Sequence, residues 1–226
     1  MMKRFALVAP LLLAAAPPAS NSPAAPDAAS AAADVYVAIE TTAGTITLDL
    51  EETRAPLTTA NFLKYVDAER FDGTAFYRSM HLDWGEQPNG LIQGGIAGTP
   101  TRAFPPVAHE PTSETGVLHK AGTISLARFA PGTGTGDFSI MVSDMPGLDA
   151  DPESDDPETR AGFAAFGHVV EGMDVVRAIW DAPLSATKGE GALKGQMIEN
   201  PVKIVSARRV EAPEPAPARN EMPEAP

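Results

Sequence analysis

The sequence predicts a mainly β fold, a barrel capped by two α-helices. Short runs that alternate apolar and polar residues recur along the chain between turn residues, which is typical of strands. Two longer segments instead repeat apolar residues at helical spacing. The expected strands span 35–41, 45–50, 74–78, 91–93, 123–127, 138–142, 164–170 and 201–210, and the expected helices begin at Pro56 and Met173.

A β-hairpin and a helix are expected first. The strand at 35–41 would gather its apolar residues on one face, and Ala43-Gly44 would turn the chain into the strand at 45–50. Pro56 suits the first turn of a helix, because its missing N–H has no helical partner there. The apolar stripe of this helix would consist of Leu57, Ala60, Phe62, Leu63 and Val66.

The second helix, from about Met173 to Ala182, would turn Val175, Val176 and Ile179 inward. Two long loops remain, at 79–90 and 149–159, and loops of this length often carry function. The second is rich in acidic residues and begins like a calcium-binding loop, but it lacks that loop's glycine and final glutamate. A solvated acidic loop is favoured, with an irregular cation site as the alternative.

The ends of the chain differ in composition from its centre. Lys3 and Arg4 precede a short apolar stretch, which predicts a signal peptide at 1–19. Residues 20–33 are rich in Ala and Pro and are expected to form a linker, and residues 211–226 are expected to form a disordered Pro/Glu-rich tail. The folded domain would therefore span 34–210. A periplasmic or secreted location follows, with no stable membrane insertion after signal cleavage.

Charge and composition exclude several kinds of function. The formal net charge is −13 and the folded region lacks a run of basic residues, so no nucleic-acid partner is expected. The chain has no cysteine, which excludes thiolate nucleophiles and cysteine-based zinc sites. No cofactor is expected, and no complete set of hydrolase residues is present.

Several segments, taken together in this order, resemble the cyclophilin family. The resemblance covers about 36–210. The segments are Ala55-Pro56, Asn61-Phe62, Phe76-Tyr77-Arg78, Leu91-Ile92-Gln93-Gly94-Gly95, Gly122–Arg128, Phe138-Ser139-Ile140 and Phe166–Val175.

The resemblance implies a closed eight-stranded antiparallel barrel with a helix at each end. It also implies a peptidyl-prolyl cis–trans isomerase that binds proline-containing segments of client proteins, assists the folding of exported proteins and works as a monomer. Arg78 would be the catalytic residue. The substrate-binding residues would be Phe76, Tyr77, Leu91, Gln93, Ala127, Arg128, Asp137, Phe138 and Leu148. The alternative function is a binding module or chaperone with little or no catalysis.

The implied roles have a chemical basis. As an X–Pro bond twists, the proline nitrogen gains a lone pair, and a permanently charged donor aimed at it would stabilise the twisted state. Arg78 would be this donor. Phe76, Phe138, Leu91 and Leu148 would seat the proline ring, although alternation in a strand equally allows Phe76 and Phe138 to be core residues. Gln93 would bond the peptide backbone, or else a nearby turn.

The sequence departs from the family pattern around the site. Tyr77 replaces the usual histidine, and Asp137 and Ser139 replace a glutamine and a phenylalanine. A carboxylate at 137 would attract Arg78, either orienting it or occupying donors that the substrate needs. Gly90 and Gly147 stand where the family usually has aromatic residues, which thins the apolar wall.

Overall fold

The computed structural model describes residues 35–97 and 99–214. The expected signal peptide and linker, and residues 215–226 of the expected tail, lie outside the described residues. The strands are β1 (Val35–Thr41), β2 (Gly44–Leu50), β3 (Ala75–His81), β4 (Gly90–Gly95), β5 (Thr123–Leu126), β6 (Asp137–Met141), β7 (Ala164–Glu171) and β8 (Met197–Val210). The helices are α1 (Pro56–Asp67), α2 (Thr112–Thr115), α3 (Pro157–Ala161) and α4 (Met173–Trp180), with single 3₁₀ turns at Pro146–Leu148 and Gly191–Leu193.

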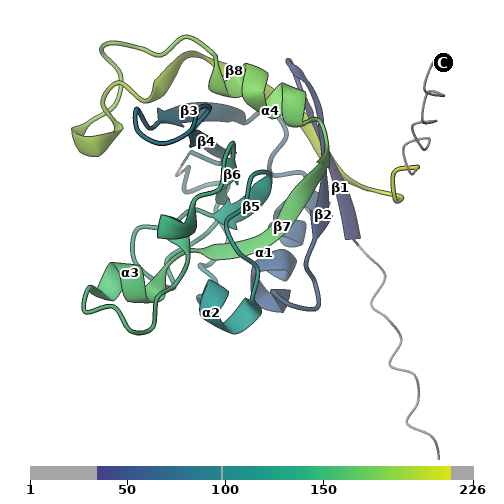
Figure 1. The fold of residues 1–226 in the computed structure, drawn as a ribbon. Helices are drawn as coiled ribbons and strands as arrows, with labels where there is room; N and C mark the ends of the chain where they lie inside the picture. Colours follow the sequence, from purple (N-terminus) through teal and green to yellow (C-terminus); the bar gives the residue numbers. More distant parts are fainter. Residues whose placement is uncertain (1–34, 98, 215–226) are drawn as a thin grey trace, which may run out of the picture. The chain divides into compact units, whose positions relative to one another are not determined.

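Within these residues, the eight strands close into a barrel in the order β1-β2-β7-β5-β6-β4-β3-β8. Each neighbouring pair is antiparallel. α1 packs on β7 and β8, whereas α4 packs on β2, β3 and β4, so the two longer helices cover different parts of the barrel (Figure 1). The predicted barrel with two capping helices is thus confirmed.

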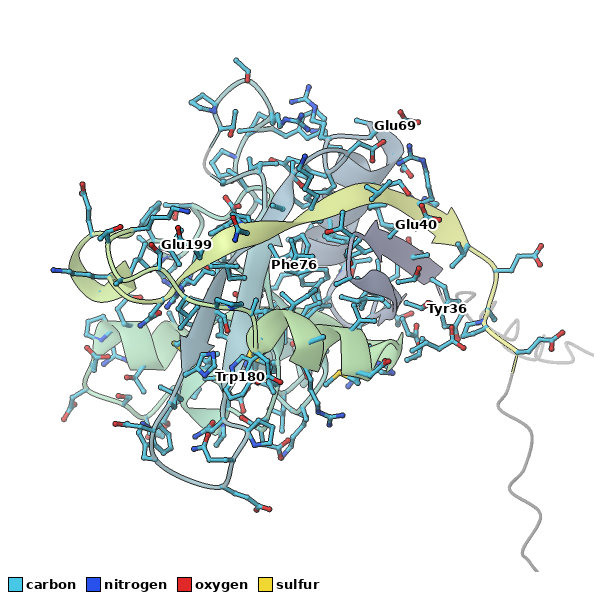
Figure 2. All side chains as sticks on the ribbon, turned by 90° about the horizontal axis from the view of Figure 1, so that it is seen from above. Tyr36, Glu40, Glu69, Phe76, Trp180 and Glu199 are labelled. Atoms are coloured by element: carbon cyan, nitrogen blue, oxygen red, sulfur yellow. The ribbon has the colours of Figure 1, made fainter. Side chains whose placement is uncertain are left out.

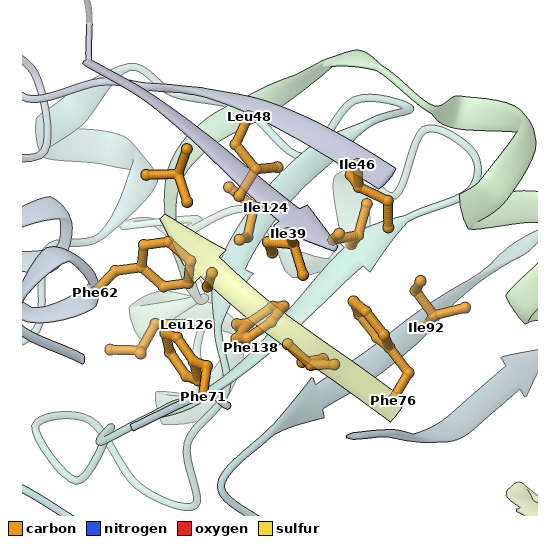
Figure 3. Close-up of a cluster of buried hydrophobic side chains, with 14 of the residues drawn as sticks. Ile39, Ile46, Leu48, Phe62, Phe71, Phe76, Ile92, Ile124, Leu126 and Phe138 are labelled. Atoms are coloured by element: carbon orange, nitrogen blue, oxygen red, sulfur yellow. The ribbon is translucent and has the colours of Figure 1, made fainter. Parts of the chain in front are cut away.

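The barrel interior is filled by aliphatic side chains and a cluster of phenylalanines (Figure 3). Phe138 lies at its centre, and its ring meets those of Phe62, Phe71 and Phe76 edge-on at centroid distances of 5.4–5.7 Å. Edge-to-face pairs of this kind are favoured by the charge distribution of aromatic rings. Because Phe62 comes from α1, the cluster also fastens this helix to the strands.

A β-bulge in β3 decides which way the site residues face. The register of β3 with β4 and with β8 shifts between Phe76 and Arg78. In a regular strand, two residues that are two positions apart share a face, whereas a bulge breaks this rule locally. Phe76 therefore points into the barrel core, while Arg78 lies on the outer face beside Gln93.

The segment 149–159 was expected to be an acidic loop, and its last residues form the start of α3. Asp156 caps this short helix, because its side chain accepts a hydrogen bond from the Thr159 N–H, 2.8 Å away. Pro157 occupies the first turn, where proline is favoured. Local capping chemistry therefore organises a segment that composition alone marks as a loop.

No helix among residues 35–97 and 99–214 combines the length and the apolar character needed to cross a membrane.

Candidate active site

Arg78 lies on the outer face of the barrel, and two amide side chains hold its guanidinium group. Nη1 donates to Oε1 of Gln93 at 2.7 Å, while Nε and Nη2 donate to Oε1 of Gln196 at 2.9 and 2.6 Å. Nη2 also contacts the sulfur of Met80 at 3.5 Å. Burial lowers the pKa of Arg78 from its ordinary value, but an arginine with such a high ordinary pKa stays charged. The site therefore holds a fixed cation.

A chain of hydrogen bonds runs from Arg78 to Asp137. The Nε2 of Gln93 donates to the Tyr77 hydroxyl at 3.0 Å, and this hydroxyl donates to Oδ1 of Asp137 at 3.1 Å. The N–H of Ala97 also donates to this oxygen, at 2.8 Å. Burial and the charge of Asp137 raise the pKa of Tyr77 well above its ordinary value, so the phenol keeps its proton. Tyr77 and Gln93 therefore connect Asp137 to Arg78 by hydrogen bonds.

An apolar cluster lies beside Arg78 and is separate from the barrel core. Its buried members are Leu91, Met141 and Met145. The partly buried side chains packed against them are Met80, Leu82 and Leu148. Leu91 and Met141 face each other across β4 and β6, at positions that alternate with the core residues Ile92 and Ile140. This cluster can seat a small apolar ring next to a cation.

The expectation that Phe76 and Phe138 seat the proline ring is wrong. Phe76 is 0% exposed and Phe138 is 1% exposed, and both belong to the core cluster inside the barrel. Phe76 is labelled in Figure 2, which shows it within the body of the barrel. The bulge in β3 explains why Phe76 points into the core although Arg78, two positions later, points outward. Phe138 and Ser139 are consecutive residues of β6, so their side chains point to opposite faces of the strand, and that of Phe138 points into the barrel.

Ala127 and Arg128 were expected to line the edge of the groove. Ala127 is half-buried beside the site, and its N–H donates to the carbonyl of Asp137 at 2.9 Å. The side chain of Arg128 is only 2% exposed. It stacks on Phe163 at 4.5 Å and donates to the Gly162 carbonyl at 2.5 Å. Its guanidinium therefore anchors the segment that follows α3 and is covered, which corrects the expectation for this side chain.

A second polar network lies next to the apolar cluster. Nδ1 of His119 is 2.7 Å from Oδ1 of Asp149, and Nε2 is 2.9 Å from the hydroxyl of Ser125. These three groups follow the order of a hydrolase triad, but Ser125 is buried and donates to the Ala164 carbonyl at 3.2 Å. A buried hydroxyl cannot reach a substrate, so the network serves to join β5 to the segment that contains Leu148.

Three residues at the site were not predicted from the sequence: Gln196, Met141 and Met145. Gln196 precedes β8, more than 100 positions after Arg78, and no local pattern marks it. Met141 could have been found, because it lies two positions after Ser139 and three positions after the core residue Phe138 in the same strand. Met145 follows a turn, where alternation gives no signal.

The chain matches a family model described as "Cyclophilin type peptidyl-prolyl cis-trans isomerase/CLD" over residues 36–209. It is 34% identical to a peptidyl-prolyl cis-trans isomerase of Acinetobacter baylyi over 80% of this chain and 88% of that protein. It is 32% identical to peptidyl-prolyl cis-trans isomerase A of Dickeya dadantii over 66% and 73% of the two chains. A crystal structure of a Cryptosporidium parvum cyclophilin matches with a TM-score of 0.59 and 19% identity, over 80% of this chain and 99% of that one.

Proposed function

Because the chain belongs to the cyclophilin-type peptidyl-prolyl cis–trans isomerase family, we propose that Arg78 carries its isomerase activity on the outer face of the barrel. The observation that supports this role is the fixed guanidinium beside an apolar cluster. Catalysis of this reaction requires no covalent step. It requires a seat for the proline ring and a donor held against the nitrogen of the bond that rotates.

The energetics explain why a fixed cation suffices. Resonance in the amide bond creates a rotation barrier of about 18–20 kcal/mol. In the twisted state this resonance is lost, and the proline nitrogen becomes a hydrogen-bond acceptor. A donor that is already oriented stabilises the twisted state more than the planar one, and only such differential binding accelerates the reaction.

Leu91 and Met145, with the partly buried Met80 and Leu148 packed against them, would seat the proline ring, and the fully buried Met141 would pack behind them. Gln93 already uses its oxygen for Arg78 and its nitrogen for Tyr77. Its second N–H proton would be the group that binds the peptide backbone. A cyclophilin-type isomerase from Cryptosporidium parvum has been crystallised in the presence of the dipeptide Ala-Pro, which fits a site for proline-containing peptides.

Arg78 can be tested with two substitutions in a protease-coupled assay of an X–Pro peptide. Arg78→Ala should lower kcat/KM at least tenfold, because the donor to the nitrogen is lost. Arg78→Lys keeps the charge but not the planar fork, and should also lose activity. Arg177→Ala is the matched control, since it removes the same charge from an exposed position on α4.

Full activity of Arg78→Ala would remove this residue from the mechanism. A wild-type protein that binds the peptide but does not accelerate its isomerisation would instead support the alternative, a binding module without catalysis.

The proposal extends to location and clients. Lys3 and Arg4, followed by the apolar stretch 5–16, support export of the protein to the periplasm or the medium. Its clients would then be proline-containing segments of other exported proteins. Mass spectrometry of the protein purified from cell fractions should find an N-terminus close to residue 20. A cytosolic protein that keeps residues 1–19 would contradict export.

A further inference from the structure

Gln196 is held beside Arg78 by its backbone, independently of its side chain. It lies between the 3₁₀ turn Gly191–Leu193 and β8. Its carbonyl accepts a hydrogen bond from the N–H of Ser79 at 2.9 Å, and its own N–H donates to the carbonyl of Leu193 at 3.1 Å. The next residue, Met197, pairs with Arg78 in the β3–β8 register. Backbone hydrogen bonds and the β3–β8 pairing therefore hold Gln196 in place, so its side chain can be changed without moving the backbone.

Gln196 and Gln93 bind different edges of the Arg78 guanidinium group. Gln196 accepts from Nε and Nη2, which form one edge of the planar group, whereas Gln93 accepts from Nη1 at the other end. An arginine side chain presents five N–H protons. Four of them have an acceptor among the described residues, and Met80 is a weak one. The proton left over is on Nη1.

We propose that Gln196 is a positioning residue that fixes the plane of the Arg78 guanidinium and turns the Nη1 side toward the substrate. This inference rests on the role of Arg78 proposed above. One acceptor on Nη1 would let the group pivot, whereas acceptors at both ends hold it. Both acceptors are neutral amides, so the full positive charge stays available to the reacting nitrogen. A carboxylate would hold the group equally well but would offset its charge.

The main test compares three variants in the isomerase assay. Gln196→Met keeps the shape of the side chain and removes the acceptor, and kcat should fall about tenfold with less than a twofold change in KM. Gln196→Glu restores the acceptor with a negative charge, and its kcat should lie between those of Gln196→Met and the wild type. Lys194→Met, an exposed neighbour in the same loop, should match the wild type.

A spectroscopic signal reports the orientation directly. In a ¹⁵N–¹H spectrum, the Nε–H resonance of Arg78 can be assigned by its absence in Arg78→Lys. Its exchange with water should become at least tenfold faster in Gln196→Met and should stay slow in Gln196→Glu, because only the former lacks the acceptor. A purely structural role for Gln196 would not move this signal selectively.

The outcomes separate this inference from the proposed function. If the Arg78 variants lose activity while Gln196→Met keeps kcat within twofold, the positioning role is overturned and the function of Arg78 stands. If Gln196→Met lowers the activity of Arg78→Lys by the same factor as that of the wild type, Gln196 acts independently of Arg78 and the inference is also wrong. If the Arg78 variants keep full activity, both proposals fall together.

Discussion

His119 is a buried residue with a polar partner at each ring nitrogen. Its Nδ1 faces Asp149 and its Nε2 faces Ser125. Burial lowers the pKa of the imidazole from its ordinary value, although Asp149 acts in the opposite direction. The folded protein therefore binds a proton at His119 less readily than the unfolded chain, in which the pKa is about 6.5.

This difference predicts a pH dependence of stability. Because the unfolded state binds more protons, the contribution of His119 is fully present above about pH 6.5 and is lost as the pH falls below that value. The slope from this one residue should be at most about 1.4 kcal/mol of unfolding free energy per pH unit. Urea unfolding between pH 7.5 and pH 5 should give a flatter profile for His119→Gln than for the wild type.

A wild-type profile that is flat between pH 7.5 and pH 5 would contradict the lowered pKa of His119.

At the scale of the elements, the start of β4 explains one departure from the family pattern. Gly90 has a φ of +151°, and a Cβ atom there would lie 1.9 Å from the carbonyl oxygen of Met80 and 2.9 Å from Nε1 of Trp180. The same Nε1 donates to the Met80 carbonyl at 3.0 Å and so joins α4 to β3. Trp180, on α4, is labelled in Figure 2. The aromatic residue usual at this position in the family cannot fit this backbone, and methionines form the apolar wall instead.

Gly90→Ala should therefore destabilise the protein by more than about 2 kcal/mol, because backbone strain and the clash with Met80 act together. Urea denaturation would measure the change. Gly147→Ala is the matched control, because no atom lies within 4 Å of a Cβ placed there, and its effect should be close to zero. Equal stability of the two variants would show that β4 can shift to accommodate a side chain at position 90.

At the scale of the whole molecule, the order of strands and helices could be predicted from the sequence because it depends on local periodicity. Whether Phe76 points inward or outward could not be predicted, because its direction depends on a bulge that shifts the β3–β4 and β3–β8 registers at once. The burial of Arg128 depends on Gly162 and Phe163, more than 30 positions later. Gln196 reaches Arg78 only through the β3–β8 pairing. Contacts of this kind arise from closure of the barrel, and the sequence pattern around each residue gives no sign of them.

The separation of the outer site from the barrel interior has a consequence for the kind of polypeptide that can be handled. A site inside a barrel would accept only a free end or a short peptide, because a chain would have to be threaded through an opening. A seat on an outside wall can instead engage a proline in the middle of a long, partly folded chain and release it sideways. If the site proposed around Arg78 is the one that acts, the length of the client and the structure at either end of it would then place no limit on turnover.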